Sequence, residues 1–226
     1  LMNYLELTAD VPLSFLDQSG YDVVALQGEQ FRFANGRESF IETMSSYFPR
    51  QRDALARYFD LVSRVAGASS LHSLKYAESD AAINTEFQLR AINDVLDELF
   101  DDELLKRVLV GNLPLYAAEQ DKTPFSTHAF IMDFYNQSAA RVVGGSDSIA
   151  TSLKNTILRY GGTVKTRQKV TKIVCDEAKA TGVVVNDNCF MAADAVVSAI
   201  HPMRTLELLD TKLIRPAFRR RIHAMP

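Results

Sequence analysis

The sequence has 226 residues, of which 47 % are hydrophobic and 23 % are charged, and this composition is that of an ordinary globular protein. The formal net charge of −3 excludes a basic field over the whole chain, so no nucleic-acid partner is expected. Two cysteines, Cys175 and Cys189, are too few for a disulfide framework or a Cys-rich zinc site, and no metal site is expected. These thiols indicate a reducing compartment.

No stretch of 18 apolar residues is present, and the first residues lack the basic and apolar regions of a signal peptide. We therefore expect a cytoplasmic protein. The chain starts at Leu1 rather than at an initiator Met, which favours a piece of a longer protein. A tag remnant or a misassigned start would look similar.

The N-terminal third combines short extended pieces with helices. Short runs with extended character, such as the alternating apolar and charged residues of Phe31–Phe33, are separated by turn-forming proline and glycine. They predict strands over residues 3–8, 21–26 and 30–33. Asn35 followed three residues later by Glu38 resembles a capping box. Apolar residues at helical spacing predict a helix behind it that ends at Pro49.

The next part, up to residue 140, is predicted to be mostly helical. A second helix begins after Pro49, and its apolar face carries Leu55, Tyr58, Val62 and Val65. Residues 84–112 again have helical periodicity, with acidic residues at the start of a shorter helix from Asp101 onward. Phe125–Tyr135 is apolar on most sides and predicts a buried helix.

After residue 140 the pattern changes to short strands around one helix. A short apolar strand and Gly144-Gly145 precede a helix that ends at Gly161-Gly162. Extended pieces are predicted over 163–165, 170–175, 180–185 and 189–192, with a turn at Asn186–Asn188 between the last two. The apolar run Ala195–Ile200 predicts a strand buried on both faces, and a last helix follows His201-Pro202. The predicted fold class is α/β, in the sense of a mixed α+β chain.

The segment from Gly144 to Pro202 resembles one family. It reads GGSDSIATSLKNTILRYGGTVKTRQKVTKIV, then ATGVVV, then ADAVVSAIHP. The order of glycine pair, helix, glycine pair, V-x-x-I strand, A-x-G-V strand and A-D-x-V-V-S strand is similar to the phytoene desaturase, carotenoid isomerase and retinol saturase group of FAD-dependent oxidoreductases. Residues 30–38 and 124–129 also resemble this group, especially its retinol-saturase-like branch. A strand–helix–strand crossover with a β-meander fits such a flavoprotein.

The resemblance implies a domain arrangement. Residues 1–140 correspond to a mostly helical substrate-binding region with a small β ribbon. Residues 141–200 correspond to the middle of a Rossmann-like FAD-binding domain, and residues 201–226 begin a return to the substrate-binding region. The G-x-G-x-x-G fingerprint, whose backbone amides hold the flavin pyrophosphate, is absent from this sequence, as is the family's C-terminal flavin segment. We therefore expect FAD in the intact protein and no bound flavin in this chain alone.

The same resemblance implies roles for individual residues. Val170 matches a valine whose backbone pairs with the adenine of FAD, Ser198 and Ala199 match a strand end near the cofactor, and Gly144 and Gly145 match a glycine pair near the flavin ring. His128, Phe130 and Tyr135 are candidates for the wall of a substrate tunnel. Each has a structural alternative: a strand valine, small packing residues, a turn, a hydrogen-bonded core histidine, or core aromatic residues. No catalytic acid or base can be named.

The resemblance implies an oxidoreductase that uses FAD to desaturate, saturate or isomerise C=C bonds of an apolar polyene or lipid. An amine oxidase on a similar scaffold is the nearest competing enzyme. A non-catalytic lipid-binding or helical interaction module without a cofactor is the alternative from another class. Residues 213–222 combine arginines with Leu213, Ile214, Phe218 and Ile222, which indicates either a solvated helix or peripheral contact with a membrane.

Overall fold

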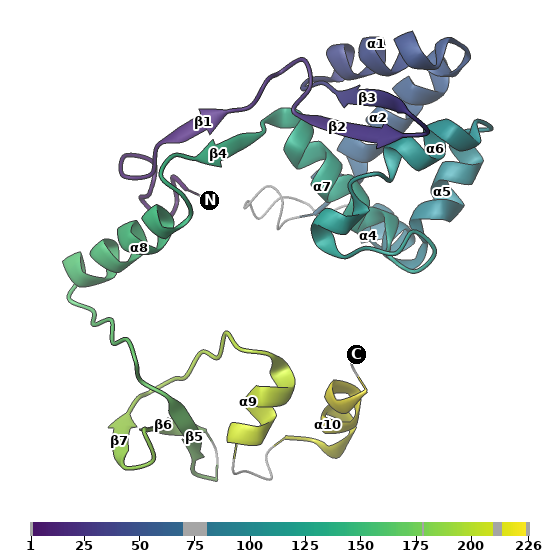
Figure 1. Ribbon diagram of the computed structural model, residues 1–226. Coiled ribbons are helices and arrows are strands. Elements are labelled where there is room, and N and C mark those ends of the chain that lie inside the picture. The colour runs from purple at the N-terminus through teal and green to yellow at the C-terminus, as the bar shows by residue number, and fades with distance from the viewer. Residues whose placement is uncertain (1, 70–80, 178, 210–213, 225–226) are drawn as a thin grey trace. The chain divides into compact units, whose positions relative to one another are not determined.

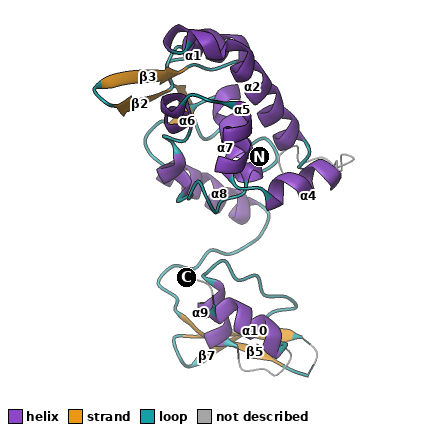
Figure 2. Cartoon of the chain, turned by 90° about the vertical axis from the view of Figure 1, so that its right-hand side faces the viewer, coloured by secondary structure: helices purple, strands orange, loops and turns teal. Residues whose placement is uncertain are grey.

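The computed structural model describes residues 2–69, 81–177, 179–209 and 214–224. The contacts divide the chain into two compact units, which are described separately: an N-terminal unit, Leu1–Thr156, and a C-terminal unit, Ile157–Pro226. Helices dominate the first, and a small sheet with two helices forms most of the second (Figures 1 and 2). The mixed α/β class predicted from the sequence is confirmed.

The N-terminal unit follows the predicted order of elements closely. Its elements are β1 (Leu13–Phe15), β2 (Asp22–Leu26), β3 (Glu29–Phe33), α1 (Arg37–Tyr47), the 3-10 helix η1 (Pro49–Gln51), α2 (Arg52–Gly67), α4 (Ala81–Leu89), α5 (Ile92–Leu99), α6 (Glu103–Leu109), the 3-10 helix η2 (Leu113–Tyr116), α7 (Phe125–Gln137), β4 (Ala140–Val142) and α8 (Asp147–Arg159). The last of these helices continues beyond the boundary between the units.

Helix α2 is the centre of the core of this unit. Its predicted apolar face is buried, with Leu55, Tyr58 and Val62 at most 1 % exposed, and the helix packs against α1 and α7. Aromatic rings from β3 and α1 extend the core, since Phe33 lies edge-on to Phe40 at a centroid distance of 5.8 Å. Helix α7 forms where a buried helix is predicted, but only one side of it is buried: Phe125 and His128 have no exposed surface, whereas Phe134 is 55 % exposed.

The β2–β3 hairpin confirms two of the predicted strands. Leu26 faces Glu29 in the register, so the turn contains only Gln27 and Gly28, both with positive φ (55° and 85°). Two such residues suit the right-handed twist of a hairpin. The strand predicted over residues 3–8 is wrong, because local turn bonds such as Leu7 N–H to the Met2 carbonyl occupy that backbone.

The capping box predicted at Asn35 and Glu38 is also wrong. Gly36, at φ 86°, is the residue before α1, and no side chain caps the helix. The Asn35 side-chain amide instead donates to the carbonyl of Tyr135 at 2.6 Å. Asn136 completes the contact: its amide donates to the Ala34 carbonyl and its side-chain oxygen accepts from the Gly36 amide. The entry into α1 is thus fixed by the end of α7.

Strand β4 pairs with β1, antiparallel and with Leu13 opposite Val142, so two segments far apart in sequence lie side by side (Figure 1). In α8, the buried Ser152 donates to the Asp10 carboxylate at 3.0 Å. These contacts join β4 and α8 to residues 10–15 of the same unit. The boundary at residue 140 implied by the family resemblance stays a prediction for the intact protein.

The C-terminal unit contains the predicted meander. Strands β5 (Val170–Cys175), β6 (Ala180–Val185) and β7 (Cys189–Ala192) form an antiparallel sheet in that order, followed by α9 (Pro202–Leu208) and α10 (Pro216–His223). The strand predicted over 163–165 is an extended coil. The buried strand predicted over Ala195–Ile200 is absent too: Val197 is 95 % exposed. Within the described residues no neighbouring strand pairs with this run, and an apolar sequence alone cannot make a ladder.

Candidate functional site

A buried histidine joins three elements of the N-terminal unit. His128 of α7 has no exposed surface. Its Nε2 lies 2.8 Å from the Tyr58 hydroxyl of α2, and its Nδ1 lies 3.0 Å from the Tyr116 hydroxyl of η2. Since a neutral imidazole has one donor and one acceptor nitrogen, one tyrosine donates to the ring and the other accepts from it.

Burial lowers the pKa of His128 to about 4, because the charged ring would lose its hydration. Burial also raises the pKa of Tyr58 well above its ordinary value. All three groups are therefore neutral at pH 7. Both ring nitrogens of His128 are occupied, which favours the structural interpretation of this residue.

The other two predicted tunnel residues lie elsewhere on α7. Phe130 pairs with Phe134 at a centroid distance of 5.8 Å, on the opposite side of the helix from His128. Tyr135 stacks on Tyr21 at 6.1 Å with an interplanar angle of 14°. The structure therefore does not bring His128, Phe130 and Tyr135 to one surface, and their role toward a substrate stays a prediction.

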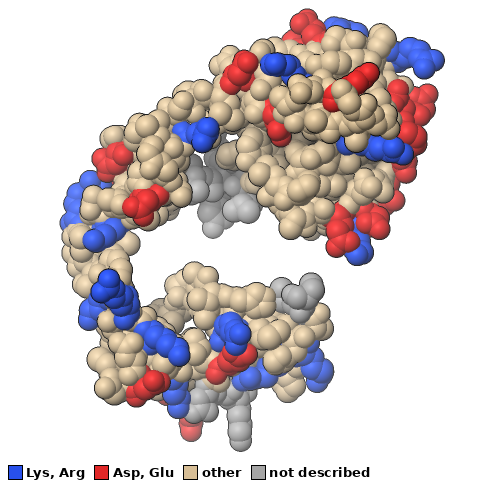
Figure 3. All heavy atoms as spheres, viewed as in Figure 1, with Lys and Arg blue, Asp and Glu red and all other residues tan. Residues whose placement is uncertain are grey.

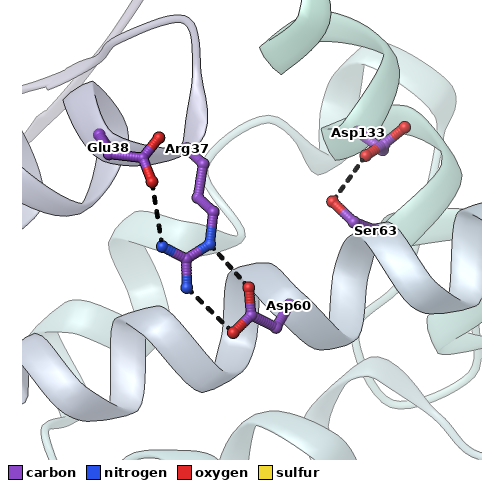
Figure 4. A network of polar contacts seen from close by, with 5 residues as sticks. All are labelled: Arg37, Glu38, Asp60, Ser63 and Asp133. Carbon is purple, nitrogen blue, oxygen red and sulfur yellow. Dashed lines mark hydrogen bonds and ion pairs between the residues drawn. The ribbon is translucent and has the colours of Figure 1, made fainter.

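A cavity of about 490 Å³, with both polar and apolar residues in its wall, lies between the start of α1, α2 and α7. At its edge Arg37 makes a bidentate pair with Asp60, with Nε–Oδ1 at 2.7 Å and Nη2–Oδ2 at 3.0 Å (Figure 4). This pairing lowers the pKa of Asp60 through the hydrogen bond from the guanidinium. Deeper in, the buried Asp133 accepts from Ser63 at 3.0 Å. The arginine is satisfied by carboxylates, so the cavity does not offer it to an anion.

A second cavity of the N-terminal unit, of about 660 Å³, lies between η1, α2 and the α5–α6 connection. Charged residues line most of it, among them Arg50, Arg57, Asp97 and Asp101. This cavity lacks the apolar lining that a polyene would need. The substrate tunnel implied by the family resemblance stays a prediction.

The predicted cofactor glycines form an exposed turn before α8. Gly144 and Gly145 have φ values of 82° and 92°, a conformation that side chains rarely adopt. A Cβ atom placed on either residue would meet nothing within 4 Å. The turn is thus held by its own bonds, including the Ser148 hydroxyl to the Gly145 carbonyl at 2.7 Å, and it leaves open space beside the backbone.

The remaining cofactor residues belong to the C-terminal unit. Val170 is the first residue of β5, faces Val185 and is 37 % exposed. Ser198 lies in the coil before α9, where its hydroxyl is 2.7 Å from that of Thr205, and Ala199 follows it as another exposed residue. His201 caps α9, its Nδ1 accepting from the Met203 amide. The contact of Val170, Ser198 and Ala199 with a cofactor stays a prediction.

Sequence reasoning missed Tyr58 and Tyr116 as partners of His128, and Tyr135 as the partner of Asn35. Nothing in the local pattern marks these pairs, because the partners are up to 100 residues apart. No cluster of three or more His, Cys, Asp or Glu residues able to hold a metal ion occurs within the described part of the chain. Among the same residues, no helix combines the length and the apolar character needed to cross a membrane.

Comparison with known proteins identifies the family. The model of the flavin containing amine oxidoreductase family matches residues 4–226. All-trans-retinol 13,14-reductase of Rattus norvegicus is 31 % identical over 186 residues, which are 74 % of this chain and 30 % of that protein. The same-named protein of Macaca fascicularis is 28 % identical, over 77 % of this chain and 31 % of its own length. The chain thus spans less than a third of these relatives.

A crystal structure of an oxidoreductase from Methanosarcina mazei shows the same fold. It aligns with a TM-score of 0.68 and 18 % identity, over 97 % of this chain and 49 % of that one. The family resemblance predicted from the motifs between Gly144 and Pro202 is therefore confirmed. The chain belongs to the flavin containing amine oxidoreductase family.

Proposed function

We propose that this chain is the substrate-binding region and the middle of the flavin domain of an FAD-dependent oxidoreductase. The enzyme acts on C=C bonds of an apolar polyene or related lipid. The family match over residues 4–226 carries the proposal. The relatives are named for the reduction of all-trans-retinol, an apolar polyene, and this supports the class of substrate. Within the family, the flavin accepts or donates the hydride.

The open backbone positions fit a flavin that is bound partly by residues outside this chain. Gly144 and Gly145 leave room for a flat ring beside the main chain. Val170 presents the start of a strand, where a backbone N–H and C=O can pair with a base edge. We assign FAD contacts to these three residues and to Ser198 and Ala199.

The exposed run Ala195–Ile200 supports the same interpretation. Its central residue Val197 is 95 % exposed and Ile200 is 52 % exposed, although both are strongly apolar. Such a run is costly in water and is typical of a strand covered on both faces. We propose that strands of the intact flavin domain, contributed from outside residues 1–226, pair with it.

The experiment compares two proteins: the 226-residue chain and the intact polypeptide encoded by the surrounding reading frame. The intact protein is expected to purify with the visible absorbance of bound flavin, and the chain alone is expected to be colourless. The intact protein is then incubated with all-trans-retinol and a chemical reductant, and the products are separated by chromatography. An intact protein without flavin, or a chain that retains it strongly, would contradict the proposal.

A further inference from the structure

Charge is unevenly divided between the two units. Residues 157–226 contain twelve Lys and Arg against six Asp and Glu, whereas residues 1–156 contain thirteen against twenty-two. Blue spheres accordingly cover more of the visible face of the C-terminal unit than red ones (Figure 3). The overall charge of −3 conceals this segregation. A positive field of this kind attracts anionic surfaces.

The positive charge is most concentrated around α10. No Asp or Glu follows Asp210 in the sequence, while four arginines lie between Arg215 and Arg221. Arg215, Arg220 and Arg221 are exposed, and no ion pair involves them within the described residues. The acidic Glu207 on the neighbouring helix α9 is already bound to Arg204 at 2.8 Å. These three guanidiniums are therefore available to an external anion.

The apolar side of α10 is only partly covered. Ile222 is buried, at 8 % exposure, and α10 packs against α9. Phe218, one helical turn earlier on the same side, is 43 % exposed. An exposed aromatic ring flanked by arginines is the arrangement of helices that lie in a membrane interface.

We propose that Ile214, Arg215 and α10 form a docking surface for an anionic phospholipid bilayer. The arginines bind lipid headgroups, and Phe218 inserts at the boundary with the acyl chains. The aromatic and aliphatic residues among the arginines favour a bilayer over nucleic acid, because an apolar side chain such as Phe218 fits the boundary between lipid headgroups and acyl chains. Leu213, part of the stretch 213–222 expected from the sequence, lies outside the described residues. The inference does not depend on the proposed reaction.

The first experiment measures binding of the 226-residue chain to sedimented vesicles. Vesicles of phosphatidylcholine with phosphatidylserine are expected to bind the chain, and vesicles of phosphatidylcholine alone are not. Raising the salt from about 0.1 M to about 1 M should abolish binding, because the Debye length falls from about 10 Å to about 3 Å. Equal binding to both vesicles, or to neither, would overturn the proposal.

Matched variants locate the surface. Each arginine near an anionic leaflet contributes about fivefold to partitioning, so Arg220→Ser with Arg221→Ser should weaken binding about 25-fold. Arg50→Ser with Arg57→Ser, two exposed arginines of the N-terminal unit, is the control and should leave binding within about twofold. A loss that is the same in both double variants would show a nonspecific charge effect and contradict the assignment.

Insertion of the ring is tested separately. The chain has no tryptophan, so Phe218→Trp creates a single fluorophore. Its emission should shift to the blue on anionic vesicles and be quenched by spin-labelled lipid. Phe190→Trp, at a ring that is 55 % exposed on β7, is the control and should not respond. Binding of a labelled single-stranded RNA more tightly than vesicles, at equal phosphate concentration, would assign the surface to nucleic acid instead.

Discussion

Nε2 of His128 and the Tyr58 hydroxyl share a buried hydrogen bond of 2.8 Å that joins α7 to α2. The variant His128→Phe leaves the Tyr58 hydroxyl in the core without a partner and also removes the bond to Tyr116. The stranded Tyr58 hydroxyl alone lowers the free energy of unfolding by about 1–3 kcal/mol. Urea unfolding followed by circular dichroism measures the change. Adding Tyr58→Phe removes the stranded hydroxyl, so the double variant should be less destabilised than the sum of the two single variants. Additive effects would show that the bond contributes no coupling.

The same histidine predicts a pH dependence of stability. Its pKa is about 4 in the folded protein, below the ordinary value of 6.5 expected after unfolding. Between these values the unfolded chain binds the proton and the folded chain does not, so stability is complete above about pH 6.5 and falls as the pH decreases toward about 4. The loss approaches about 3 kcal/mol.

The contribution of His128 is isolated by comparison with His128→Asn. Carboxylates also titrate at the lower end of this range, but they do so in both proteins. The difference in unfolding free energy between the original chain and the variant should therefore decrease as the pH falls from 6.5 to 4. A difference that stays constant with pH would mean that His128 titrates normally in the folded state.

A second tyrosine gives the opposite expectation. The Tyr21 hydroxyl is buried and has no hydrogen-bond partner among the described residues, while its ring stacks on Tyr135. Tyr21→Phe removes the unsatisfied hydroxyl and keeps the ring, so the free energy of unfolding should stay equal or rise by up to about 1 kcal/mol. Tyr58→Phe, which removes a bonded hydroxyl, is the matched control and should lower it. Destabilisation by Tyr21→Phe would reveal a partner for this hydroxyl.

The contact between α1 and α7 predicts another loss of stability. Asn136 is 4 % exposed and satisfies both the Ala34 carbonyl and the Gly36 amide. Asn136→Ala removes the donor to the Ala34 carbonyl, while the Gly36 amide keeps its 3.0 Å bond to the backbone carbonyl of residue 136, so a cost of about 1–3 kcal/mol is expected in urea unfolding. Asn188→Ala, at an exposed turn, is the control and should change stability by less than about 0.5 kcal/mol. Equal effects of the two substitutions would show that the contact is not stabilising.

These contacts show how far the sequence determines the fold. Helical periodicity identified α2, because its apolar face is set by residues three and four apart. The apolar character of Phe125–Tyr135 identified α7. The β2–β3 hairpin was likewise encoded locally. Asn35 was misassigned since its partner, Tyr135, lies 100 residues away and no local pattern indicates it. A short polar side chain fits a helix cap and a distant carbonyl equally well.

The candidate site was predictable only in part. Positive φ at Gly144 and Gly145 agrees with the requirement for glycine, which is a local backbone property. The strand expected over Ala195–Ile200 does not form, because a strand needs a neighbouring strand to pair with. The apolar residues of this run predict burial, but they do not show whether such a neighbour is present. The lining of the cavities could not be predicted either, since η1, α2 and the α5–α6 connection meet only through tertiary packing.

The flavin contact at the glycine turn is tested in the intact protein with two matched glycines. Gly145 and Gly161 both have positive φ, at 92° and 80°, and a Cβ atom on either meets nothing within 4 Å. Alanine at either position should therefore cost a similar conformational strain of about 1–2 kcal/mol. Only Gly145→Ala places a methyl group where the flavin ring is proposed to lie. Flavin per protein, measured by absorbance after purification, should fall at least tenfold in Gly145→Ala and stay unchanged in Gly161→Ala. If both variants retain flavin equally, the glycine turn does not contact the flavin ring, and the residues that bind the ring lie elsewhere in the flavin domain.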